Sequence, residues 1–173
     1  MLVVPTQMAN LAAIFANKGW YVDPHLVKHI GPIDGGSTPA YERHDVGIDA
    51  HWFDLVQEAM RRVVNEPGGT ARQARIPGID VCGKTGTAEN PHGKDHAVFI
   101  AFAPMQEPKI AMAVYVENSG FGGTWAAPIA SLLMEQYLTD SISRPDVEQR
   151  MLEADLIAVE HLYKKPPKKA RRR

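Results

Sequence analysis

Residues 79–117 constrain the fold of this chain more than any other stretch, because they contain three strand-like runs joined by short connections. The runs cover residues 79–87, 96–103 and 109–117. The second and third runs are close enough in sequence to form a β-hairpin. The third run is apolar on both faces, which is the pattern of a strand buried within a sheet. We therefore expect a mostly antiparallel sheet built around these runs.

Helical segments surround this sheet, and each has apolar residues at helical spacing. The first follows Thr6, which suits an N-cap position, and stops near Gly19. The second begins at Asp49 and ends before Pro67, and we expect Thr124 to cap the third. The predicted fold class is α/β (α+β), with helices packed on the sheet. The side chains predicted to face inward are Trp52, Leu55, Val56, Ala59, Met60 and Val63 in the second helix, and Ile129, Leu132, Leu133, Gln136 and Tyr137 in the third.

The charge of the chain is unevenly distributed along its length. The net charge is −1, but residues 164–173 contain seven Lys or Arg and no acid, so the preceding residues carry −8. Such an acidic body argues against nucleic-acid binding, which requires clustered cations to neutralise phosphates. We expect residues 1–139 to form the domain portion, and residues 140–173 to form a charged helix followed by a disordered basic tail.

Other compositional features exclude several kinds of site. No stretch is long and apolar enough for a transmembrane helix, and the N-terminus lacks the pattern of a signal peptide. Cys82 is the single cysteine, so no intrachain disulfide can form, and we expect it to be packed rather than reactive. His25, His29 and His44 lack the accompanying ligands of a metal site, and we predict neither a metal nor a cofactor.

Residues 81–88 concentrate the chemistry of the chain, because they combine Lys84 with the hydroxyls of Thr85 and Thr87 and with two glycines. Residues 78–85 also match the phosphate-loop pattern G-x-x-x-x-G-K-[ST], which works only after a buried strand and at the start of a helix. Here the stretch upstream is polar, and the stretch downstream contains too much glycine and proline for a helix. A nucleotide-binding P-loop is therefore the weaker alternative.

The stronger interpretation places this segment on an edge strand that binds an extended, peptide-like ligand with a carboxylate. Side chains alternate along a strand, so Lys84 should point to one face and Thr85 and Thr87 to the other. Gly83 and Gly86 keep bulky side chains away from the edge, where a peptide can add main-chain hydrogen bonds.

Residues 84–88, Lys-Thr-Gly-Thr-Ala, resemble the Lys-Thr-Gly motif of penicillin-binding proteins and serine β-lactamases. The resemblance to class B penicillin-binding proteins, and most of all to the penicillin-binding protein 2 subfamily, extends over residues 2–139 in the same order. It implies a β-lactamase/transpeptidase-like fold that is incomplete on its N-terminal side. The other segments that carry it are residues 6–19, 95–104, 114–118 and 126–130.

By this resemblance, the reaction is D,D-transpeptidation of peptidoglycan stem peptides through a serine acyl-enzyme, and β-lactams bind as substrate mimics. Lys84 would be a supporting catalytic residue that also helps to hold the substrate carboxylate. Thr85 and Thr87 would bind that carboxylate, and the backbone of Thr87 would supply one oxyanion-hole amide. Gly86 and Ala88 complete the predicted binding strand. The implied partners are membrane-bound wall-elongation proteins at the periplasmic face of the bacterial inner membrane.

The sequence departs from the family pattern because S-x-x-K, which carries the nucleophile, and S-x-N are both absent from its 173 residues. In the family both motifs precede the helix that Thr6 begins, so we expect them, together with the membrane anchor, upstream of Met1. The isolated chain should then be inactive, because covalent catalysis needs a nucleophile. Its sheet should also expose an edge that is normally paired. A non-catalytic remnant that only binds peptide is the other alternative.

Overall fold

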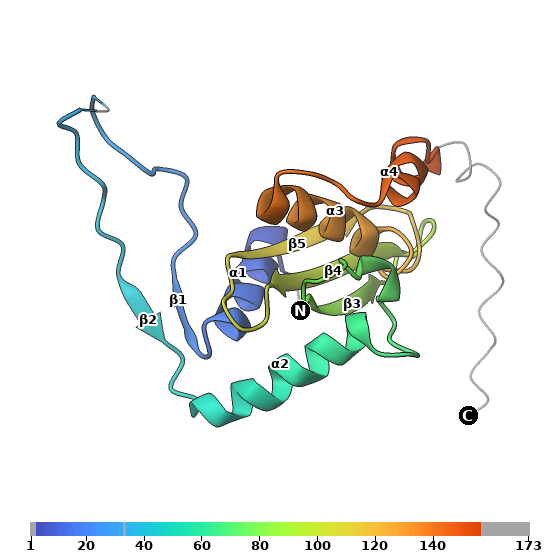
Figure 1. Ribbon diagram of the computed structural model, residues 1–173, viewed down its shortest axis with the longest axis horizontal. Coiled ribbons are helices and arrows are strands. Elements are labelled where there is room, and N and C mark those ends of the chain that lie inside the picture. Colours follow the sequence, from blue (N-terminus) through green and yellow to red (C-terminus); the bar gives the residue numbers. More distant parts are fainter. Residues whose placement is uncertain (1–2, 33, 157–173) are drawn as a thin grey trace.

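The computed structural model describes residues 3–32 and 34–156, and a three-stranded antiparallel sheet lies at its centre (Figure 1). The three predicted strands are confirmed, although the first starts later than expected. The strands are β3 (Cys82–Ala88), β4 (His96–Ala103) and β5 (Ile110–Val116), which are paired in that order.

The two faces of the sheet carry separate hydrophobic clusters. Phe102 of β4 lies opposite Cys82 in the register and packs on one face with Met60. Phe99 packs on the other face with Met134 and several alanines. Because successive residues of a strand point to opposite faces, the central strand contributes a phenylalanine to each cluster.

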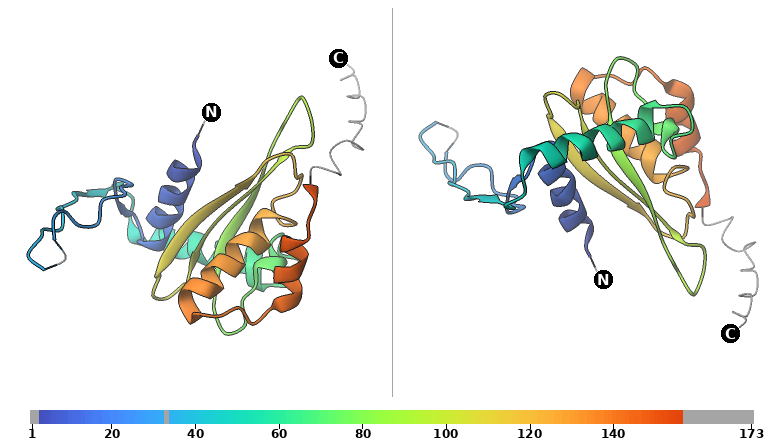
Figure 2. Two further views of the ribbon diagram at one scale, coloured as in Figure 1. Left: turned by 90° about the horizontal axis from the view of Figure 1, so that it is seen from above. Right: turned by 90° about the horizontal axis from the view of Figure 1, so that it is seen from below.

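Helices cover both faces of the sheet (Figure 2). Two helices lie on the face of Phe102 and one lies on the face of Phe99. Among the residues that the structure describes, no helix has the length and apolar character required to cross a membrane. The helices on the Phe102 face are α1 (Pro5–Ala16) and α2 (Ala50–Asn65), and the helix on the Phe99 face is α3 (Ala126–Thr139).

The helix starts agree only in part with the sequence predictions. The start of α2 is within one residue of the predicted one, because Asp49 is its N-cap and the Asp49 carboxylate accepts a backbone N–H of the first turn. The cap predicted at Thr6 is wrong, because α1 begins at Pro5, whose missing N–H needs no partner in a first turn. The cap predicted at Thr124 is also wrong, because α3 begins after Trp125 and has no side-chain cap.

The buried face of α2 is rotated from the predicted one. Gln57 belongs to the buried face, where its amide donates to the Phe15 carbonyl at 2.7 Å. The predicted residues Trp52, Leu55 and Val56 are instead 56%, 61% and 37% exposed, and we call them the exposed α2 stripe. The prediction failed because the apolar part of this helix is wider than the face that the sheet covers. The buried residues are Phe53, Gln57, Met60 and Val64, and of these Met60 was predicted correctly.

The buried face of α3 also differs from the prediction. Leu133 and Tyr137 are exposed, whereas small alanines pack against the sheet. Glu135 lies on this buried face because an ion pair with Arg144 satisfies its carboxylate. An apolar groove between α3 and α4 (Pro145–Leu152) contains the predicted residues Ile129, Leu132, Leu133 and Gln136.

The predicted domain boundary between residues 139 and 140 stays a prediction. The charged helix expected after residue 139 is present as α4, which begins at Pro145 and ends at Leu152. The predicted disordered basic tail falls within residues 157–173, which lie outside the described residues.

A two-stranded arm extends away from the sheet (Figure 1). It consists of β1 (Trp20–Val22) and β2 (Arg43–Asp45), which pair antiparallel. The Arg43 guanidinium lies 4.4 Å from the centre of the Trp20 ring and joins the two strands. Between these strands, residues 26–30 form no strand, although Ile30 makes an isolated bridge with Ser37.

β5 is an edge strand in the described part of the chain, so the prediction that it is buried within a sheet is wrong. Most of its side chains are half-buried, and Tyr115 is 38% exposed. The open edge agrees with the expectation that this sheet exposes an edge. The open edge also explains why the prediction for β5 was wrong, because the apolar pattern of β5 suits a strand with neighbours on both sides.

Candidate functional site

β3 forms the opposite edge of the sheet and carries the Lys-Thr-Gly residues. The strand continues through Thr85 to Ala88, where a phosphate loop would begin a helix, so the P-loop hypothesis is wrong. Lys84 and Thr87 are exposed, and Gly86 is half-buried. No other described strand pairs with the outer edge of β3, which leaves backbone groups available to an added strand.

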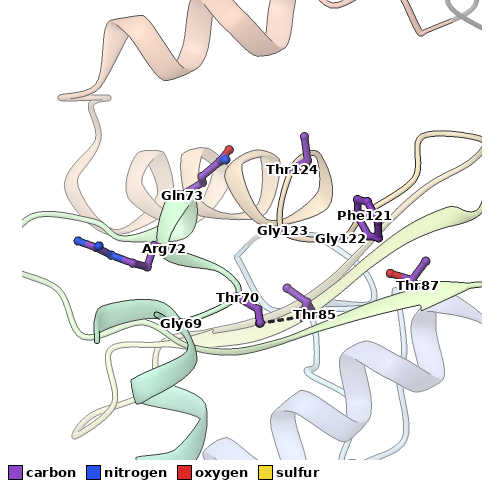
Figure 3. A pocket seen from close by; sticks show the side chains of 10 residues that line it. All are labelled: Gly69, Thr70, Arg72, Gln73, Thr85, Thr87, Phe121, Gly122, Gly123 and Thr124. Carbon is purple, nitrogen blue, oxygen red and sulfur yellow. Dashed lines mark hydrogen bonds between the residues drawn. The ribbon is translucent and has the colours of Figure 1, made fainter. Parts of the chain in front are cut away.

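Thr85 and Thr87 lie at a hollow beside the strand (Figure 3). This hollow, which we call the hydroxyl pocket, has a volume of about 460 Å³. Its walls come from the turn after α2, from β3 and from the loop before α3. Thr85 lies opposite Phe99 in the sheet and shares its face, on the side of α3. The predicted alternation along β3 is therefore confirmed.

The loop before α3 lies directly against the backbone of the sheet. A side-chain carbon on Gly122 would clash with the carbonyl oxygens of Val98 and Gly86. One on Gly123 would clash with the carbonyl oxygen of Thr70. Glycine allows this close approach because it has no Cβ. The loop therefore forms a closely packed wall of the hydroxyl pocket.

Lys84 lies on the face opposite to the two threonines. Its ammonium group donates a hydrogen bond to the Thr85 backbone carbonyl at 2.7 Å, and its side chain does not line the hydroxyl pocket. The separation follows from the alternation of side chains along a strand. A ligand laid along the edge of β3 would meet hydroxyls on one side and an ammonium group on the other.

Two loops are tied together at the far end of β3. The Asn90 side-chain amide donates to Asn118 Oδ1 at 2.6 Å, and the Asn118 backbone N–H donates to His96 Nδ1 at 3.0 Å. Beside these contacts, Thr87 and Trp125 line a second hollow of about 270 Å³. Sequence reasoning missed this network, because its members come from separate loops and match no local motif.

Cys82, at the start of β3, is fully buried, as the sequence predicts. Burial, together with the nearby negative charge of Asp80, raises the pKa of its thiol to about 12. A thiol with such a pKa is not ionised at neutral pH, so Cys82 cannot act as a nucleophile there.

Comparison with known proteins places this geometry in a family. Residues 1–135 match the family model of the penicillin-binding protein transpeptidase domain. The peptidoglycan D,D-transpeptidase PbpA of Mycolicibacterium smegmatis is 39% identical over 144 residues, which are 73% of this chain and 28% of that protein. The peptidoglycan D,D-transpeptidase MrdA of Haemophilus influenzae is 34% identical over 167 residues, which are 84% of this chain and 25% of that protein. The chain therefore spans about a quarter of the length of these curated relatives.

Solved structures agree with the sequence relatives. Pseudomonas aeruginosa PBP2 in complex with WCK 5153 superimposes with a TM-score of 0.68 at 38% identity, covering 82% of this chain and 31% of that one. The imipenem acyl-enzyme complex of penicillin-binding protein A from M. tuberculosis gives a TM-score of 0.69 at 34% identity, covering 79% of this chain and 31% of that one. The matching residues and the shared fold show that this chain belongs to the penicillin-binding protein transpeptidase domain family.

Proposed function

We propose that this chain is the substrate-binding portion of a peptidoglycan D,D-transpeptidase. The observation that carries the proposal is the arrangement on β3, whose outer edge is unpaired by any described strand and whose functional side chains divide between two faces. A stem peptide in extended form can add to this edge through main-chain hydrogen bonds. Its terminal carboxylate would then lie beside the hydroxyl pocket.

The side chains of β3 have different roles in this proposal. Thr85 and Thr87 donate hydrogen bonds to the terminal carboxylate, because an ionised carboxylate only accepts them. Lys84 adds positive charge from the other face and joins the polar network around the serine. The Thr87 backbone N–H is one donor to the oxyanion that forms when the serine attacks. Gly86 and Ala88 present backbone without bulk.

A serine elsewhere in the protein must supply the nucleophile, because this sequence contains no S-x-x-K or S-x-N motif. Its oxygen would attack the carbonyl of the D-Ala-D-Ala bond, form an acyl-enzyme and release the terminal D-alanine. An amine of a neighbouring stem peptide would then take the acyl group. β-Lactams would react with the same serine, and the known acyl-enzyme complexes of penicillin-binding protein A with imipenem and penicillin G support this part.

The proposal also covers the place and the partners of the chain. Similarity to the MrdA and PbpA transpeptidases supports a role in wall synthesis at the periplasmic face of the bacterial inner membrane. There the whole protein would act with membrane-bound wall-elongation proteins and thereby affect cell shape.

Penicillin labelling tests whether the nucleophile and the substrate-binding strand lie in different portions of the protein. The 173-residue chain is mixed with a separately produced N-terminal portion that carries S-x-x-K and S-x-N, and a fluorescent penicillin is added before denaturing electrophoresis. The chain alone should remain unlabelled. In the mixture, label should appear on the N-terminal portion, and only when this chain is present.

The matched control for this experiment is the Thr85→Val/Thr87→Val double variant, which should reduce labelling of the mixture. Covalent label on the chain alone would contradict the proposal, because it would reveal a nucleophile within these residues. An unlabelled mixture in which the chain still binds a D-Ala-D-Ala peptide would instead favour the non-catalytic, peptide-binding remnant.

A further inference from the structure

We propose that Thr70 is a positioning residue that orients the Thr85 hydroxyl toward the substrate carboxylate. This inference rests on the proposed function, in which Thr85 binds that carboxylate. The Oγ1 atoms of Thr70 and Thr85 lie 3.0 Å apart and are hydrogen-bonded, as Figure 3 shows. Both side chains line the hydroxyl pocket. Thr70 belongs to the turn after α2 rather than to β3, so it lies outside the Lys-Thr-Gly motif.

The backbone around Thr70 is held from two sides. Beside it, the Ala71 N–H donates to the Val63 carbonyl near the end of α2 at 3.0 Å. Gly69 lies so close to that same helix end that a side-chain carbon would clash with the Val63 oxygen. On the other side, Gly123 leaves no room for a Cβ against the Thr70 carbonyl. The position of the Thr70 backbone is therefore set by packing. The residue itself is exposed, and its hydroxyl is oriented by the hydrogen bond to Thr85.

The chemistry of hydroxyl groups gives this contact a direction once a carboxylate is bound. A threonine hydroxyl has one proton to donate and two lone pairs that accept. If Thr85 gave its proton to Thr70, it could only accept, and its oxygen would face a carboxylate that also only accepts. The favourable arrangement has Thr70 donating to Thr85 and Thr85 donating to the carboxylate. Hydrogen bonds linked in this way polarise and strengthen one another.

Other polar groups of the pocket are less well placed for this role. In Figure 3, the Arg72 side chain extends away from Thr85, and Thr124 lies on the far wall. Thr87 lies on the same strand face as Thr85, where it can contact the ligand itself. Among the described residues, Thr70 is the side chain whose hydroxyl is hydrogen-bonded to that of Thr85.

The test measures non-covalent binding by NMR titration of the isotope-labelled 173-residue chain. The probes are an acetylated Lys-D-Ala-D-Ala peptide with a free carboxylate and the same peptide with a C-terminal amide. Thr70→Val removes the hydroxyl with little change of shape, and it should weaken binding of the acid by up to about tenfold, the scale of one hydrogen bond between neutral groups. Binding of the amide should change less than twofold. Thr70→Ser, which keeps a hydroxyl, should restore acid binding.

Two further variants make the result decisive. Thr38→Val removes an exposed hydroxyl from a distant loop and should bind both probes like the wild type. Thr85→Val should lose acid binding at least as strongly as Thr70→Val.

If Thr70→Val binds the acid like the wild type while Thr85→Val does not, the positioning role is overturned and the proposed function stands. If Thr70→Val weakens the acid and the amide equally, or Thr70→Ser fails to restore binding, Thr70 is merely structural. If the wild type binds the two probes equally, the carboxylate site and this inference fall together.

Discussion

Arg144 and Glu135 form a buried ion pair whose guanidinium nitrogen and carboxylate oxygen lie 2.8 Å apart. Their side chains are only 12% and 3% exposed. Arg144 also donates to the Arg75 carbonyl at 3.0 Å, beside the short 3-10 helix η1 (Arg72–Ala74). Burial alone would raise the pKa of Glu135, but hydrogen bonds from Ser143 and Arg144 outweigh burial and place that pKa below its ordinary value. The pair therefore joins α3 to the segment before α4 and to the η1 region.

Arg144→Met should strongly destabilise the chain at neutral pH. It leaves the Glu135 carboxylate buried without its partner, and breaking a buried ion pair in this way costs about 3–5 kcal/mol. Urea unfolding at pH 7 measures the loss. The matched control is Glu135→Gln/Arg144→Met, which removes both charges and should cost clearly less. Equal losses in the single and double variants would contradict this account.

Arg144→Met should also change how the stability of the chain depends on pH. In the wild type the folded pKa of Glu135 is lowered, so its contribution to stability is present above the unfolded pKa and is lost as pH falls through the folded value. Without Arg144, only the Ser143 hydrogen bonds oppose burial, so the folded pKa of Glu135 should rise and the stability that Glu135 contributes at neutral pH should shrink. Unfolding free energies measured between pH 3 and pH 7, relative to a Glu135→Gln background, should therefore rise less steeply with pH in Arg144→Met than in the wild type. Parallel curves would contradict this expectation.

Gly122→Ala should disturb the wall of the hydroxyl pocket. The added carbon would meet the backbone oxygens of Val98 and Gly86, which cannot move without distorting the sheet. A loss of about 1–3 kcal/mol in unfolding free energy is expected for such overpacking. Gly86→Ala is the matched control, because its added carbon approaches only the Val98 side chain, at 3.2 Å or more. An equal or larger loss for Gly86→Ala would contradict the proposed cause.

Cys82 should resist thiol reagents while the chain is folded. The side chain is fully buried and its pKa is raised to about 12, so both access and the thiolate form are missing at neutral pH. Reaction with a chromogenic disulfide at pH 8 should be slow in native buffer and complete within the mixing time in denaturant. Rapid stoichiometric reaction in native buffer would show that this end of β3 opens readily.

Leu55→Glu should test the exposed α2 stripe. Leu55 is 61% exposed, so the substitution should change the stability of the isolated chain by less than about 0.5 kcal/mol. Met60→Ala on the buried face of the same helix should cost about 2–5 kcal/mol. We expect Leu55→Glu to reduce penicillin labelling in the mixture with the N-terminal portion, because an exposed apolar stripe suits an interface with the rest of the domain. Undiminished labelling would exclude Leu55 from that interface.

Strands were predicted from the sequence more accurately than helix faces. β4 has the predicted limits, and Thr85 and Thr87 share the predicted face. A strand has only two faces, so alternation leaves a single choice once the strand is located. The short strand β2 was missed because its residues, Arg-His-Asp, have no apolar pattern and pair only through the arm.

Local patterns in the sequence were enough to predict where the three strands lie along the chain, the helix that begins after Asp49 and the grouping of hydroxyls on β3, because these depend on side-chain period and on helix-start signals. Packing in three dimensions selects which side of α2 and α3 is buried, since overlapping apolar stripes on a helix leave more than one face possible. The same packing creates the contacts between Thr70 and Thr85 and between Arg144 and Glu135. Such pairs are separated in the sequence and match no local motif, and they meet only when the turn after α2, the sheet and α3 pack together.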